Sequence, residues 1–162
     1  MEFLNGLKLV VAIAKAKLKC KNSVRMATIE FALELSGPKC DEILGELPGA
    51  IVRGFNAMGK QHGKRFDFDM VIHSQNLECR MAPDMHPSLR ITDTDIHDLR
   101  LEMYDKSSGA IALYFSVTTE LTKEVAVFLA ANFGESAWLT VSECQQQLPM
   151  ASAVERSAAR PN

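Results

Sequence analysis

Apolar and polar residues alternate one by one over several stretches of this chain, and this pattern constrains the fold more than any other feature. Successive side chains of a β-strand point to opposite faces, so a period of two is typical of a strand with one buried face. The clearest case is 24–35, where Ala27, Ile29, Phe31, Leu33 and Leu35 are expected to face inward. The same alternation predicts further strands at 15–21, 66–72, 77–81, 99–104, 111–117 and 137–141.

Turn and loop residues separate these predicted strands. Asn22 and Ser23 lie between two alternating stretches, so we expect 15–21 and 24–35 to pair as a hairpin. The stretch 105–109 ends in a glycine and predicts a turn between two more strands, and 83–87 begins and ends with proline and predicts a loop.

Helices are predicted in four places. Phe3, Leu7, Val10, Val11 and Ala14 fall on one face of a helix over 3–14. Two short helices are predicted at 39–46 and 49–58, separated by a proline and ended by a glycine. Thr122 is expected to cap a helix over 123–132, because a threonine hydroxyl accepts a free N–H of the first turn.

Together these elements predict an α+β fold. We expect an antiparallel sheet or half-barrel of five to seven strands, with the helices packed on one side. Residues 1–148 are predicted to form a single domain, since 162 residues suit one core and no repeat is present. Residues 149–162 are small, polar and without period, which predicts a disordered tail that is dispensable for folding.

Composition narrows the cellular setting. The net charge is −2, so the whole protein is no polycation, and any nucleic-acid binding would need a local basic patch. Cys20, Cys40, Cys79 and Cys144 are far apart, and we expect free thiols in a reducing compartment, mostly within the core. The apolar run 9–14 is too short for a signal peptide or a membrane span, so we expect a cytoplasmic protein with no membrane association.

The chain contains no recognisable catalytic or metal-binding motif. A nucleophile elbow, a phosphate-binding glycine loop and a zinc-protease helix are all missing. His73, Cys79 and His86 lack the close ligand pairs of structural zinc sites, and the acidic loop 93–98 fails the calcium-loop pattern. We therefore expect no metal, no cofactor and no enzyme activity. The alternative is a small enzyme whose site is assembled from distant residues, around His73, His86 and His97.

The most unusual local feature is a row of lysines. Lys15, Lys17, Lys19 and Lys21 alternate with other residues, so a strand would place all four ammonium groups on one face, about 7 Å apart. Arg25 is expected to extend the row. Such a row suits the phosphates of nucleic acid or a row of carboxylates on a partner. It also suits an edge strand that must avoid pairing with other chains, and no aromatic residue lies among the lysines to stack on bases.

The last third of the chain resembles a known kind of protein. The stretches that carry the resemblance are Asp98-Leu99-Arg100-Leu101-Glu102, Ala112-Leu113-Tyr114-Phe115-Ser116-Val117, Glu124-Val125-Ala126-Val127-Phe128-Leu129, Trp138-Leu139-Thr140-Val141 and Gln145-Gln146-Gln147-Leu148. Over residues 96–148, this strand–strand–helix–strand order resembles uncharacterised accessory proteins of tailed bacteriophages and prophages. The resemblance implies a phage or mobile-element origin and assigns no site residues.

These observations support three hypotheses of function. The first is a non-catalytic accessory protein that binds a protein of nucleic-acid metabolism or host defence. The second is a nucleic-acid-binding protein that uses the lysine-rich strand face, and it is less favoured because the chain is acidic overall. The third is the small enzyme described above. The sequence indicates neither the target nor the oligomeric state.

Overall fold

The computed structural model describes residues 8–35, 65–105 and 110–144 of the chain. Within them lie seven strands and one helix. In chain order they are β1 (Lys8–Lys21), β2 (Val24–Leu35), β3 (Arg65–Asp67), β4 (Ile72–Arg80), β5 (Leu89–Asp105), β6 (Ala110–Glu120), α3 (Lys123–Asn132) and β7 (Ser136–Glu143).

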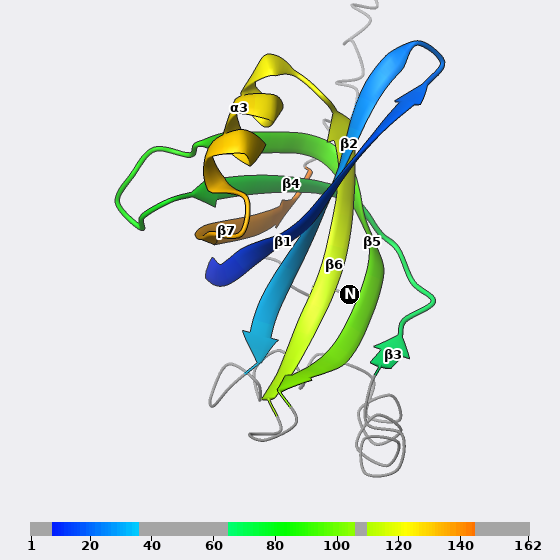
Figure 1. Ribbon diagram of the computed structural model, residues 1–162, viewed down its shortest axis with the longest axis vertical. Helices are drawn as coiled ribbons and strands as arrows, with labels where there is room; N and C mark the ends of the chain where they lie inside the picture. Colours follow the sequence, from blue (N-terminus) through cyan, green and yellow to red (C-terminus); the bar gives the residue numbers. More distant parts are fainter. Residues whose placement is uncertain (1–7, 36–64, 106–109, 145–162) are drawn as a thin grey trace, which may run out of the picture.

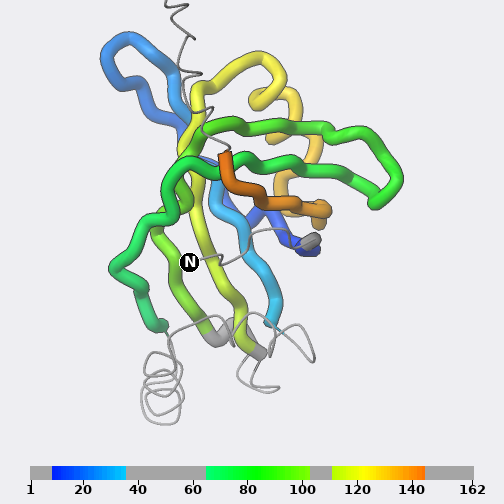
Figure 2. Tube along the Cα trace, turned by 180° about the vertical axis from the view of Figure 1, so that it is seen from behind, coloured from blue at the N-terminus to red at the C-terminus, as the bar shows by residue number. Residues whose placement is uncertain are grey.

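All seven strands belong to one antiparallel sheet that closes on itself. The hydrogen-bonded order is β3-β5-β4-β7-β1-β2-β6, and β6 also pairs with β5. Closure follows from the length of β5, whose first half pairs with β4 and whose second half pairs with β6. In Figures 1 and 2, β4 and β7 run across the long strands β2 and β6, so the sheet is strongly twisted.

The predicted α+β class, with helices packed on one side of a sheet or half-barrel, is wrong. The described part is almost entirely sheet, and α3 is its single helix. The predicted helix over 3–14 reaches into β1, where Leu9, Val11 and Ile13 are buried with a period of two. The predicted helices at 39–46 and 49–58, and the predicted tail at 149–162, lie outside the described residues.

A bulge in β1 explains why its first half looked helical. The pairing of β1 with β2 shifts between Ile13 and Lys15, so Ala14 is an extra residue in the strand. Before the bulge the odd-numbered residues face inward, and after it Ala16 takes the inward position opposite Ile29. The change of phase in the sequence therefore marks a bulge within one strand, and not the boundary between a helix and a strand that the pattern predicts.

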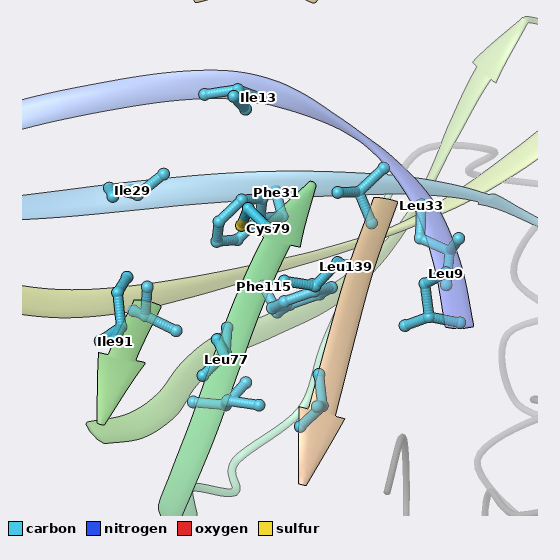
Figure 3. Packing of buried hydrophobic residues seen from close by; sticks show 14 of the residues in the cluster. Leu9, Ile13, Ile29, Phe31, Leu33, Leu77, Cys79, Ile91, Phe115 and Leu139 are labelled. Atoms are coloured by element: carbon cyan, nitrogen blue, oxygen red, sulfur yellow. The ribbon is translucent and has the colours of Figure 1, made fainter. Parts of the chain in front are cut away.

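The core fills the inside of the closed sheet. Phe31 and Phe115 are directly paired on β2 and β6, both are 0% exposed, and their ring centroids are 5.6 Å apart. Figure 3 shows them among inward side chains of β1, β4 and β7. Cys79 is also buried there, and burial raises the pKa of its thiol to about 12. The inward face predicted for 24–35 is confirmed, and the strand predicted at 137–141 lies within β7.

Helix α3 forms as predicted from its local signals. The main-chain N–H of Val125 donates to Oγ1 of Thr122 at 3.3 Å, which is the expected cap. Val125, Phe128 and Leu129 are buried. Gly134 then takes a positive φ of 81°, and its N–H donates to the carbonyl of Ile13, which leads the chain into β7 beside β1.

Candidate binding surface

The basic hairpin, residues 15–25, projects from the body of the protein. It consists of the last part of β1, the turn and the first residues of β2, and Figures 1 and 2 show it extending beyond the other strands. Asn22 and Ser23 form the predicted two-residue turn, with φ of 49° and 65°. Two positive φ values are typical of the turn type that matches the twist of a hairpin. The predicted pairing of 15–21 with 24–35 is thus confirmed.

Both faces of the basic hairpin are open to solvent. All its residues except Ala16 are exposed, including Leu18 at 63% and Val24 at 41%. Leu18 lies opposite Ala27 and Val24 lies opposite Lys21, so the two exposed apolar side chains belong to different faces of the hairpin.

The four lysines lie on one face, as the alternation predicted. Their partners across the hairpin are Val24 for Lys21, Met26 for Lys19, Thr28 for Lys17 and Glu30 for Lys15. Directly opposite residues of an antiparallel pair share a face of the sheet. None of the four lysines forms an ion pair with any residue in the part of the chain that the structure describes.

Arg25 does not extend the lysine row. It pairs with Cys20, so its side chain belongs to the opposite face, which also carries Leu18. The reason is the length of the turn. With two turn residues, Lys21 faces Val24, and the next residue along must point to the other side. The basic hairpin therefore has a lysine face and a second face that combines Leu18, Cys20 and Arg25.

Charge is distributed very unevenly between the basic hairpin and the rest of the chain. Residues 15–25 contain four lysines and one arginine and no carboxylate. Subtracting these five charges from the net charge of −2 leaves −7 for the rest of the chain. A concentrated positive charge on an otherwise acidic protein steers acidic partners to one place and orients them.

A polar groove of about 330 Å³ lies at the base of the basic hairpin. Its lining combines charged groups of both signs from distant parts of the chain: Lys15, Lys17, Glu30, Arg65, Asp67, Phe68, Asp98, Leu99 and Arg100. Because β1 and β2 form one wall of this groove, it continues the lysine face toward the body of the protein.

Arg100 organises this groove. Its guanidinium donates to Glu30 at 2.7 Å and to Glu102 at 3.1 Å, and it lies 4.3 Å from the centroid of the Tyr114 ring. The hydrogen bond with Glu30 is the main reason that the pKa of Arg100 is raised. The side chains of Arg100 and Glu30 are only 13% and 18% exposed, so this pair is shielded from solvent.

Arg65 is the second arginine of the groove, and it is also occupied. Its Nε donates to both carboxylate oxygens of Asp67, at 2.8 and 2.9 Å. The arginines of the groove are therefore neutralised by carboxylates, whereas Lys15 and Lys17 have no such partner among the described residues. This leaves the lysines as the cations available to a ligand.

The edge of β1 is open along the basic hairpin. On that side β1 pairs with β7 only from Lys8 to Ala12, and two further hydrogen bonds join Ile13 to the turn before β7. Beyond Ile13, no described residue bonds to this edge. The lysines therefore lie beside an unpaired strand edge, as the hypothesis that they prevent pairing with other chains requires.

The three histidines of the alternative enzyme hypothesis do not meet at one place, although His73 and His97 both lie near Asp95. His73 contacts Asp95 at 3.0 Å, while His97 contacts Asp98 at 3.0 Å and Thr118 at 2.9 Å. The N–H of Ser74, and then His73, lower the pKa of Asp95. His73 is the second residue of β4, whereas His86 lies beyond Arg80, the last residue of that strand.

Other site types find little support in the described part of the chain. Within residues 8–35, 65–105 and 110–144, no three His, Cys, Asp or Glu side chains are grouped so as to hold a metal ion. In the same ranges, no helix has the length and apolarity to cross a lipid bilayer. Cys20, Cys79 and Cys144 are free thiols, but only Cys79 is buried, so the expectation of mostly core cysteines is wrong for the described ones.

Comparison with protein-family models, with curated proteins and with solved structures gave no match. The surface must therefore be interpreted from its own chemistry. The sequence pointed to the lysines, but it missed Glu30, Arg65 and Arg100, which meet only through cross-strand pairing. The two-residue turn was the signal that would have placed Arg25 on the other face.

Proposed function

We propose that this protein is a non-catalytic binding protein whose basic hairpin docks on an acidic surface of a partner protein. The observation that carries the proposal is the projecting, solvent-exposed hairpin with five positive charges and no negative one. A projecting element reaches a partner surface without rearrangement of the body.

The second face of the hairpin favours a protein over a nucleic acid as the partner. Leu18 on this face is 63% exposed, and an apolar contact of this kind strengthens a protein interface but gains little from phosphates. The hairpin carries no aromatic residue on which bases would stack.

The resemblance of residues 96–148 to phage and prophage accessory proteins supports a specific setting for this role. The protein would act in the cytoplasm of a host cell, and the partner would be a protein of nucleic-acid metabolism or host defence. An acidic tail or an acidic surface patch on such a partner would suit a row of lysines.

Direct nucleic-acid binding is the second candidate function. It is favoured by the spacing of the lysines, because four ammonium groups about 7 Å apart match the phosphate repeat of an extended strand. The acidic remainder of the chain, at −7, would repel the same phosphates.

The experiment that tests the proposal compares the parent with the double variant K17E/K19E. Both tagged proteins are used to capture partners from a bacterial lysate, and captured proteins are then purified and titrated against each. We expect the variant to lose at least about tenfold in affinity for an acidic partner, because each reversal replaces an attraction with a repulsion. The parent is also titrated with single- and double-stranded DNA over a range of salt concentrations.

The matched control is R90E/K123E, which changes the net charge equally at exposed positions outside the hairpin. It should bind the partner as well as the parent does. Equal binding by K17E/K19E would contradict the proposal. Tight DNA binding by the parent, with a steep salt dependence, would favour the second candidate instead.

A further inference from the structure

The open edge of β1 presents a defined set of main-chain groups. In a hairpin with a two-residue turn, the residues that flank the turn exchange both hydrogen bonds, and every second pair does the same. Here those pairs include Lys21 with Val24 and Lys19 with Met26. The residues between them, Leu18 and Cys20, must therefore direct their N–H and C=O groups away from β2.

A hydrogen bond on the other side of the hairpin supports this assignment. Arg25 is the partner of Cys20, and its carbonyl accepts from the N–H of Leu121 at 2.8 Å, on the side away from β1. The groups of Cys20 correspondingly point outward from β1. The same parity applies to Leu18 and Ala16, so three consecutive outward residues offer three donors and three acceptors.

Along this edge, positively charged side chains alternate with uncharged ones. Lys15, Lys17, Lys19 and Lys21 line one face, and Ala16, Leu18 and Cys20 line the other. A strand added at the edge would place its own side chains on these two faces in turn. Acidic residues would lie beside the lysines, and apolar residues would lie beside Leu18.

We propose that the partner binds by adding an extended, antiparallel strand to the open edge of β1, through a segment in which acidic and apolar residues alternate. This inference rests on the proposed function and specifies its geometry. Main-chain hydrogen bonds supply affinity in strand addition, and alternate side chains supply specificity. The lysines then select the partner through charge complementarity.

A second copy of this chain is a poor occupant of the same edge. Two such edges paired about a twofold axis would place lysines opposite lysines, which is unfavourable across a strand pair. The same four lysines that discourage self-pairing thus favour an acidic strand. The lysines therefore disfavour edge-to-edge pairing between copies of this chain.

The first experiment measures binding of synthetic peptides to the full chain. The probe is a capped seven-residue peptide of alternating valine and glutamate, and its control has the same composition with the valines and glutamates in separate blocks. We expect the alternating peptide to bind at least about tenfold more tightly, since only it places every glutamate beside a lysine.

N-methylation of the peptide tests the hydrogen bonds directly. In the antiparallel arrangement, the valines lie opposite Leu18 and its outward neighbours, so valine N–H groups donate to β1. Methylating the valine nitrogens should cost about tenfold or more, and methylating the glutamate nitrogens should cost little. Equal losses would overturn strand addition, and a loss confined to the glutamate set would overturn the antiparallel orientation.

Amide hydrogen exchange provides an independent measurement on the protein itself. In the free protein, we expect the N–H groups of Ala16, Leu18 and Cys20 to exchange faster than those of Lys17 and Lys19, which bond to β2. The alternating peptide should slow exchange at the first three selectively. Binding without such protection would overturn this inference, yet leave acidic docking intact; if neither acidic peptide bound, the proposed function would fail with it.

Discussion

The same two strands, β1 and β2, behave differently in the body of the protein and in the basic hairpin. In the body, Ile13 and Phe31 are directly paired and both are 0% exposed, inside a closed sheet. In the hairpin, Leu18 is 63% exposed and the β1 edge has no partner among the described residues. Strand pairing thus continues past the point where burial ends.

Under the proposed function, this difference assigns stability to the body and binding to the hairpin. An isolated hairpin is marginal in water, so the basic hairpin depends on the body, which fixes the register of both strands where they leave it. The body in turn gains little from the hairpin, because few of the hairpin's side chains are buried. Substitutions should therefore affect stability in the body and recognition in the hairpin.

The largest effect on stability is expected from Phe115→Ala. Phe115 is 0% exposed and lies against Phe31, so its loss leaves a cavity in the centre of the core and should cost about 3–5 kcal/mol. Denaturant unfolding of the parent and the variant measures the difference. The matched control is Leu18→Ala, which should change the free energy of unfolding by less than about 0.5 kcal/mol.

A mild effect of Phe115→Ala would show that the closed sheet tolerates a central cavity, and a large effect of Leu18→Ala would show that the hairpin is packed. Either result would contradict the expectation that stability depends on the body and not on the hairpin. The burial of Phe115 was predicted from alternation and is confirmed.

Local signals in the sequence predicted the elements that depend on neighbouring residues alone. The cap at Thr122, the bounds of α3 and the turn at Asn22 and Ser23 all follow from short-range hydrogen bonding and backbone preference. The bulge at Ala14 could not be separated from a helix end, because both change the phase of an apolar pattern. That ambiguity contributed to the wrong α+β class.

Long-range pairing explains what the sequence could not predict about the surface. Glu30, Arg65 and Arg100 are far apart in the chain, and only the pairings of β2 with β6 and of β5 with β3 and β6 bring them into one groove. The closure of the sheet also depends on long-range pairing, because β5 pairs with β4 along its first half and with β6 along its second half. The lysine face was predictable because its four members lie on one strand.

An intermediate effect on stability is expected from Arg100→Met. This change keeps much of the side-chain volume but leaves Glu30, which is 18% exposed, without its cation. An unpaired, largely buried carboxylate should lower the free energy of unfolding by about 1–3 kcal/mol. The matched control is Arg65→Met, since the Arg65–Asp67 pair is 56% and 61% exposed and should contribute about 0–1 kcal/mol.

Equal costs for the two arginine variants would contradict this expectation. They would mean that solvent screens the Arg100–Glu30 pair as fully as the Arg65–Asp67 pair. The groove would then contribute as little to the stability of the fold as the hairpin does. Thermal or denaturant unfolding at two salt concentrations separates these cases. Salt should reduce the effect of Arg65→Met more than that of Arg100→Met, because exposed pairs are screened more strongly.

The smallest effect on stability is expected from K17E/K19E, the variant that should have the largest effect on binding. Neither lysine has an ion-pair partner among the described residues, and both are exposed, so reversal removes no contact that stabilises the fold. The opposite residues, Thr28 and Met26, carry no charge with which glutamate would clash. We therefore expect the free energy of unfolding to change by less than about 0.5 kcal/mol, measured by denaturant unfolding. If stability fell by several kcal/mol instead, the loss of binding could no longer be assigned to recognition, and the division between a stable body and a binding hairpin would fail.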